Sequence, residues 1–118
     1  MNERGKAVLS IGGVLVVVVP AVLDDAAVVS LQEDLSFRVA DKGARGVVID
    51  LSAVDVVDTF VGRRLSLIAS VAGMLGARPV LVGVRPTVAQ TVVRLGVGLD
   101  DMTTVRDLDA GLKLLGAR

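Results

Sequence analysis

The chain has 118 residues, 53% hydrophobic and 22% charged, which suits one domain around a single core. Its thirteen basic and thirteen acidic residues cancel, and Tyr and Trp are absent, so neither a basic field nor stacking aromatics favour nucleic acid as a partner. Because Cys and His are both absent, thiol chemistry, the commonest general base and the commonest metal ligand are removed, and we expect a non-enzymatic, protein-binding domain without cofactor or metal.

The chain opens with two short apolar runs that glycines separate. Residues 7–11 and 14–19 flank Gly12 and Gly13, and a Gly-Gly pair between strand-like runs is typical of a β-hairpin. Pro20 ends the second run, because proline cannot donate a hydrogen bond to a strand ladder. The segment therefore predicts two antiparallel strands.

Residues 14–23, VLVVVVPAVL, also resemble the hydrophobic segment of a signal peptide. The run is too short to span a bilayer, Pro20 interrupts it, and no A-x-A cleavage site follows. A buried strand is the better interpretation. No later segment is long enough to span, so we expect a soluble, cytoplasmic protein that makes no membrane contact.

A first helix and a central strand follow. Asp24 or Asp25 can cap the start of the helix, and Gly43 is placed to end it. The inner face of the helix repeats at helical spacing through Val28, Leu31, Leu35 and Val39. Residues 47–51, VVIDL, form a continuous apolar run, which indicates a strand covered on both faces.

Residues 59 to about 75 form the second predicted helix, which Gly76 ends. One apolar stripe consists of Val61, Leu65, Ile68, Ala72 and Leu75. A second stripe consists of Phe60, Leu67, Val71 and Met74. Two stripes predict a wide buried arc.

The last third of the chain predicts two more strands and two more helices. Residues 79–84 form a strand, and Pro86 begins a helix that Gly96 ends. Residues 102–104 suit a short edge strand, and Thr104 with Asp107 resembles a capping box for a helix along Val105, Leu108, Leu112 and Leu115. The order β-β-α-β-α-β-α-β-α predicts an α/β fold with one mixed sheet.

Asp50, Asp55 and Asp58 gather between the central strand and the second helix. Turn formation and helix capping are the favoured roles, and a metal site with oxygen ligands is the weaker alternative. A Gly and an Arg in GVRP precede the third helix and could meet an anion, although an ordinary strand-to-helix turn is favoured.

Thr59 has two compatible interpretations. It is a competent helix cap, a task that Asp58 could share. A phosphoryl group there would add about −1.5 to −2 charges, which the helix dipole tolerates and the neighbouring carboxylates repel. The fold would survive, whereas a partner docked over this surface would meet a large new charge.

The stretch VVIDLSAVDVVDTFVGRRL and the element order resemble the STAS domain of anti-sigma-factor antagonists. That family shows an apolar strand ending in Asp-Leu-Ser, a few residues, then Asp-Ser or Asp-Thr opening a helix. The matching positions are residues 50–52 and 58–59, and the similarity continues through GARPVLVGVRPTVAQTVVRLGV. The resemblance implies one STAS-type (SpoIIAA-like) domain over residues 1–118, with a mixed, mainly parallel sheet and about four helices.

The segment LDDAAVVSLQEDL looks like that of the stand-alone antagonists of stressosomes. This resemblance implies a scaffold that sequesters a switch serine/threonine kinase in stress signalling. It also implies that phosphorylation at Thr59, where the usual residue is Ser, weakens the hold on the kinase. The implied partners are that kinase, co-antagonist STAS proteins and further copies of the chain, in a homodimer or a larger assembly.

The stretch RPTVAQTVV also resembles the co-antagonist type, whose STAS domain carries a second phosphorylatable threonine. The matching position is Thr91, for which an exposed polar residue one turn from Thr87 is the alternative. The co-antagonists have an additional N-terminal sensor domain, whereas this chain begins directly with the first strand, so we expect the stand-alone type. A simple antagonist that binds an anti-sigma kinase and frees a sigma factor stays open.

The start of the second helix is the predicted partner surface. Its predicted residues are Asp55, Asp58, Thr59, Gly62 and Arg63. Arg63 and Arg64 do not suit the positive end of the helix dipole, so they either face acidic groups of a partner or form a solvated face.

Overall fold

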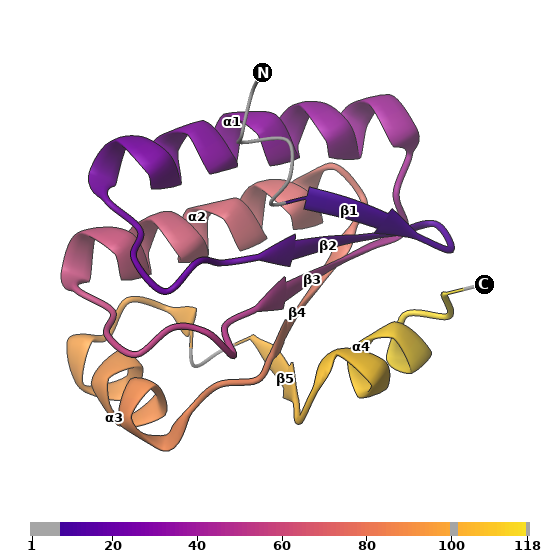
Figure 1. Ribbon diagram of the computed structural model, residues 1–118. Coiled ribbons are helices and arrows are strands. Elements are labelled where there is room, and N and C mark those ends of the chain that lie inside the picture. The colour runs from indigo at the N-terminus through magenta and orange to yellow at the C-terminus, as the bar shows by residue number, and fades with distance from the viewer. Residues whose placement is uncertain (1–7, 100–101, 118) are drawn as a thin grey trace.

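The computed structural model describes residues 8–99 and 102–117, and these residues form one five-stranded sheet with helices on both faces (Figure 1). The strands lie across the sheet in chain order: β1 (Val8–Ile11), β2 (Val14–Val18), β3 (Gly46–Asp50), β4 (Arg78–Val82) and β5 (Thr103–Val105). β1 is antiparallel to β2, and the other neighbours are parallel. The predicted mixed, mainly parallel sheet is confirmed.

The helices are α1 (Asp25–Lys42), α2 (Thr59–Met74), α3 (Pro86–Leu95) and α4 (Leu108–Leu114). α1 and α2 lie side by side over one face of the sheet and begin at the same end, whereas α4 covers the other face (Figure 1). α3 joins the α1 and α2 side through Val88 and Val92. Parallel strands joined by helices thus bring several strand ends and helix starts to one end of the sheet.

Alternation along β2 explains why an almost uninterrupted run of valines is buried. Leu15 and Val17 pack into the larger core beneath α1 and α2, whereas Val14 and Val16 pack toward α4. β3 divides in the same way, with Val47 and Ile49 in the larger core. A strand covered on both faces needs apolar residues at every position, so its sequence shows no polar alternation.

Turns and helix ends follow the predicted chemistry. Gly12 and Gly13 both have positive φ, 56° and 85°, which forms a two-residue hairpin turn between β1 and β2. Asp24 caps α1 by accepting a hydrogen bond from the Ala27 N–H at 2.7 Å. Gly43, with φ 61°, donates its N–H to the Val39 carbonyl and ends α1.

The capping box predicted before the last helix is wrong. Thr104 lies within β5, paired with Leu81 of β4, and Asp107 caps α4 by accepting from the Ala110 N–H at 3.0 Å. Val105 belongs to the strand as well, so α4 begins only at Leu108. A short carboxylate three residues before an amide caps a helix by itself, and Thr104 is then free to extend the sheet.

The wide buried arc predicted for α2 is narrower in the structure. Val61, Leu65, Ile68 and Ala72 are buried, whereas Phe60, Leu67, Met74 and Leu75 are all exposed by more than a third. α2 contacts the sheet on one side and α1 on another, so its remaining surface faces solvent. The second apolar stripe is therefore mostly a surface feature.

The valine run after the hairpin is a strand, as the favoured interpretation held. Residues 14–18 form β2, and the Val19 N–H continues the ladder by donating to the Asp50 carbonyl at 3.1 Å. The predicted start of the first strand, Ala7, lies outside the described residues. Over residues 8–99 and 102–117, no helix has both the length and the apolar character needed to cross a membrane.

Candidate functional site

The loop between β3 and α2 packs on the core through an apolar residue at every third position. Leu51, Val54 and Val57 are all less than 4% exposed, and they anchor the loop against the core. Asp55 and Val56 lie between two of these anchors and face solvent. The spacing of valines in LSAVDVV thus presents a carboxylate and an apolar side chain on a loop that is anchored to the core.

Hydrogen bonds fix the start of the same loop. Asp50 accepts the Ser52 N–H on its carboxylate at 2.9 Å, and the Leu51 N–H donates to the Val82 carbonyl at 3.0 Å. The Val54 N–H donates to the Leu51 carbonyl at 3.0 Å. The bond from Ser52 to the Asp50 carboxylate is the turn-forming role expected for Asp50.

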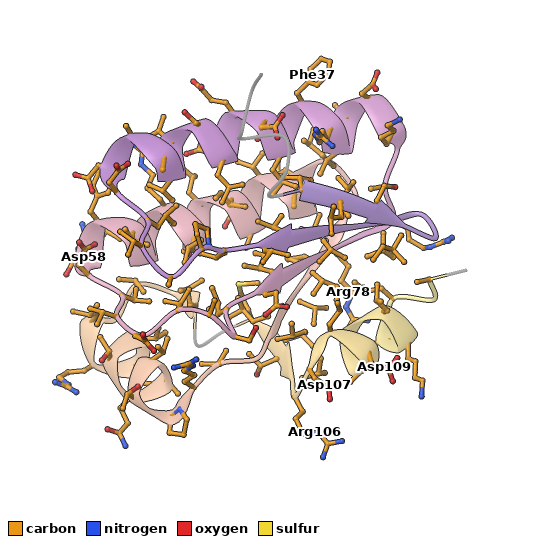
Figure 2. All side chains as sticks on the ribbon, viewed as in Figure 1. Phe37, Asp58, Arg78, Arg106, Asp107 and Asp109 are labelled. Atoms are coloured by element: carbon orange, nitrogen blue, oxygen red, sulfur yellow. The ribbon has the colours of Figure 1, made fainter. Side chains whose placement is uncertain are left out.

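Asp58, and not Thr59, caps α2. Asp58 has extended dihedral angles, φ −90° and ψ 175°, and its carboxylate accepts the Val61 N–H at 2.8 Å. Thr59 is the first residue of the helix and is exposed, and its hydroxyl has no hydrogen-bond partner in the described part of the chain. The expectation that Thr59 caps the helix is wrong, which leaves its hydroxyl accessible. Figure 2 shows Asp58 at the outer end of α2.

Arg85, the residue just before α3, clasps the loop that leads to α2. Its Nε donates to the Ser52 carbonyl at 2.9 Å, and its guanidinium pairs with the Asp55 carboxylate. The guanidinium of GVRP thus pairs within the protein, in a strand-to-helix turn. Arg85 and Asp55 are 30 residues apart, and sequence reasoning missed the pair. The available signal was that both follow adjacent parallel strands at their carboxyl ends.

Gly83 allows the two loops to approach each other. Its φ is 68°, and a Cβ there would lie 2.8 Å from the Ser52 Cβ and 3.2 Å from an Asp50 carboxylate oxygen. Both the backbone conformation and the space therefore require glycine. The β3–α2 loop and the loop before α3 therefore pack directly against each other at Ser52 and Gly83. We call the contacts of Arg85 with Ser52 and Asp55 the loop clasp.

The two arginines of α2 have different roles. Arg64 donates to the Gln32 side chain at 3.0 Å, which ties α2 to α1, and it lies 5.3 Å from the centre of the Phe60 ring on its own helix. Arg64 is thus engaged within the protein, and a partner contact through it stays a prediction. Arg63 is exposed, one turn after Thr59, and no ion pair involves it among the residues that the structure describes.

Gly62 lies inside the protein, beneath the predicted surface. A Cβ at Gly62 would meet a Val97 methyl at 3.0 Å and a Val57 methyl at 3.3 Å. It is a packing position that allows the loop after α3 to lie against the first turn of α2. The placement of Gly62 among surface contacts is corrected, because its neighbours cover it.

Thr91 lies on α3, away from the Thr59 helix. It is half-buried, and its hydroxyl donates to the Thr87 carbonyl one turn earlier at 3.0 Å. This hydrogen bond agrees with the alternative of a polar residue one turn from Thr87, and phosphorylation of Thr91 stays a prediction. The structure brings Asp55, Asp58 and Thr59 to one end of the sheet, and it leaves Thr91 on a separate element with its hydroxyl already engaged.

The three carboxylates around the site are engaged separately. One forms a turn, one pairs with an arginine and one caps a helix. Over the described ranges, no group of three acidic residues is arranged to hold a metal ion. The metal alternative for Asp50, Asp55 and Asp58 finds no support in this arrangement.

Two exposed valines flank the start of α2. Val56 is 79% exposed, and Val22, on the loop between β2 and α1, is 87% exposed. A small hollow of about 80 Å³ separates the two loops, with Asp58 at its lining. Sequence reasoning missed these valines, because neighbouring Val54 and Val57 have the same side chain and are buried.

A family model of the STAS domain matches residues 6–115 of the chain. The chain belongs to the STAS-domain family. The solved structure of a serine-to-glutamate variant of RsbS from Moorella thermoacetica is similar with a TM-score of 0.84 and 36% identity, covering 93% of this chain and 96% of that one. A chain in a structure described as the molecular architecture of the stressosome, a signal integration and transduction hub, is similar with a TM-score of 0.83 and 37% identity. That match covers 92% of this STAS domain and 95% of the other chain.

Among sequence relatives, the RsbT co-antagonist protein RsbRA of Bacillus subtilis is 34% identical over 83 residues. These residues are 70% of this chain and 30% of RsbRA, so the STAS domain matches less than a third of that relative's length. The family and the fold inferred from the DLS and DT motifs are confirmed. The resemblance to the RsbS type is confirmed by the RsbS match over nearly the whole chain.

Proposed function

We propose that this STAS domain is a cytoplasmic, non-catalytic scaffold of a stressosome-type assembly. It sequesters a switch serine/threonine kinase of the RsbT type, and phosphorylation of Thr59 releases that kinase into stress signalling. The observation that carries this proposal is the RsbS-like fold over 93% of the chain, combined with an exposed threonine as the first residue of α2.

The chemistry of the α2 start supports a switch there. Because Asp58 supplies the cap, the Thr59 hydroxyl is free to accept a phosphoryl group without loss of the capping bond. The added charge of about −1.5 to −2 lies at the positive end of the helix dipole, so the helix persists. Phosphorylation of Thr59 would therefore change the surface charge at the start of α2 without changing where the helix begins.

The same added charge disfavours a docked partner. A partner that covers Val56 must remove water from the first turn of α2, and it would then bury the phosphate next to Asp58. Removing the phosphate from water is costly even if Arg63, one turn later, pairs with it, and the adjacent carboxylate adds repulsion. We therefore assign the kinase contact to Asp55, Val56, Asp58, Thr59 and Arg63, with Val22 at its border.

The remaining partners in the proposal are STAS proteins. The relatives include an RsbT co-antagonist, and similar chains occur in a stressosome structure. We propose that this domain assembles with co-antagonists of the RsbR type and with further copies of itself. Size-exclusion chromatography with such a co-antagonist should give a complex close to the void volume. A small dimer or heterodimer would instead favour a simple anti-sigma-factor antagonist.

Phosphorylation mapping tests the switch residue. The protein is incubated with its cognate kinase and ATP, and modified peptides are identified by mass spectrometry. We expect phosphate on Thr59 and its loss in Thr59→Ala, whereas Thr87→Ala, an exposed threonine on α3, serves as the matched control and keeps the phosphate. Phosphate found wholly elsewhere, or undiminished in Thr59→Ala, contradicts the assignment. Phosphate on Thr91 would assign a co-antagonist-like second site.

A further inference from the structure

A cavity of about 270 Å³ lies between α3 and the end of the sheet, separate from the first turn of α2. It is lined by Leu51, Leu81, Val84, Ala89, Val92, Val93, Leu99 and Thr104. The residues come from the carboxyl ends of β3 and β4, from α3, from the segment after α3 and from β5. Seven of the eight are aliphatic, so the wall is apolar.

The cavity exists because α3 packs on the core through few side chains. Val88 and Val92 are its only fully buried residues among those that the structure describes, and Ala89 is too short to fill the space beside them. An apolar protein cavity of about 150 Å³ stays dry and binds benzene or xenon. The cavity under α3 is larger, and Val93 and Thr104 on its lining are exposed, which provides an entry from solvent.

The lining defines the chemistry of an occupant. Among the residues that the structure describes, no charged side chain lines the cavity, so an ion would lose its hydration there without compensation. No aromatic side chain lines it either, so no stacking platform favours a base. Thr104 contributes the one side-chain hydroxyl, and that hydroxyl has no hydrogen-bond partner within the described ranges.

We propose that this cavity binds a small, neutral, largely apolar molecule that carries at most one hydroxyl group, directed at Thr104. The site stands independently of the proposed kinase switch. Two of its lining residues are adjacent in sequence to residues of the Arg85 contact between the loops, because Leu51 precedes Ser52 and Val84 precedes Arg85. Occupancy should therefore be sensed at the clasp as well as in the cavity.

The test is a methyl and amide NMR titration of the full chain with benzene and, separately, with benzyl alcohol. We expect the methyl signals of Leu51, Val84 and Val92 to shift and to saturate at millimolar probe, as suits a ligand of this size. The methyl signals of Leu35, a buried residue of α1 that does not line the cavity, should not shift. Shifts that rise linearly up to the solubility limit, or that spread over the exposed apolar residues, would overturn the proposal.

Three variants locate the binding. Ala89→Leu fills the cavity and should abolish saturable binding, whereas Gln90→Leu adds the same side chain at the adjacent exposed position and should leave binding intact. If Ala89→Leu fails to fold, Val93→Phe, which fills the cavity from its exposed rim, is compared with Gln90→Leu instead. Unchanged binding in a folded cavity-filling variant would overturn the proposal.

Thr104→Val tests the hydroxyl at nearly constant shape. Loss of one neutral hydrogen bond should weaken benzyl alcohol about fivefold and leave benzene unchanged. Equal effects on both probes would contradict the role of Thr104. Shifts of the cavity methyls with protein concentration alone would show that a second copy occupies the cavity, which also contradicts a small-molecule site.

Discussion

Replacement of Asp58 and of Thr59 by alanine separates the two candidate caps of α2. Asp58→Ala removes the carboxylate that accepts the Val61 N–H at 2.8 Å, and loss of such a cap costs about 1 kcal/mol, within a range of about 0.5–2. The lost charge at the helix start adds about 0.3–1 kcal/mol. Asp58→Ala should therefore lower the free energy of unfolding by about 1–2 kcal/mol.

Thr59→Ala should change the free energy of unfolding by less than about 0.5 kcal/mol, because the side chain is exposed and bonds to no described residue. Asp58→Asn keeps a capping acceptor and removes only the charge, so it should lie between the two. Urea unfolding followed by circular dichroism measures all three, with an unchanged m-value as the check on two-state behaviour. A larger loss in Thr59→Ala than in Asp58→Ala would refute the cap assignment.

Three further comparisons test the surroundings of the site. Gly83→Ala forces a side chain into a positive-φ position and against the β3–α2 loop, and it should lower the free energy of unfolding by about 2 kcal/mol. Gly73→Ala, on the open side of α2, should raise the free energy of unfolding by about 0.5 kcal/mol. Equal effects of Gly83→Ala and Gly73→Ala in urea unfolding would contradict the close contact between the two loops. Arg64→Ala should lower the free energy of unfolding by about 1 kcal/mol, because the bond to Gln32 on α1 and the contact with the Phe60 ring are lost. Arg63→Ala should lower it by less than about 0.5 kcal/mol, and reversed values would exchange the two roles. Arg85→Ala should lower the free energy of unfolding by less than about 1 kcal/mol, because its ion pair with Asp55 is exposed. It should nevertheless speed amide hydrogen exchange in the loop before α2. Unchanged exchange would show that the Arg85 contacts do not order this loop.

Much of the fold could be predicted because local chemistry and global packing agree. Gly12 and Gly13 allow only a tight hairpin of positive φ, and Gly43 ends α1 in the conformation that glycine favours. The continuous valines of β2 and β3 indicated a sheet covered on both faces, which the two cores provide. At these positions the local sequence pattern is compatible with only one backbone conformation or burial pattern.

The errors occurred where two adjacent residues could fill one role. Asp58 and Thr59 are both competent caps, and the backbone angles of the junction, which no pattern gives, decide in favour of Asp58. Val54, Val56 and Val57 are chemically alike, and only the path of the loop leaves Val56 exposed. Such choices depend on tertiary packing.

The remaining features of the site are long-range contacts. The Arg85 clasp joins two loops 30 residues apart, and the position of Gly62 under Val97 joins α2 to the segment after α3. Strand order could have placed Arg85 near Asp55, because both follow adjacent parallel strands. The burial of Gly62 has no comparable signal in its neighbours along the chain.

The central claim is that negative charge on Thr59 releases the kinase. Equilibrium binding of the RsbT-type kinase to the wild-type protein, to Thr59→Glu and to the control Thr87→Glu measures this directly. We predict at least about tenfold weaker binding for Thr59→Glu, equivalent to about 1.4 kcal/mol, and wild-type binding for the control. Equal affinity of the wild-type protein and a folded Thr59→Glu would contradict the account.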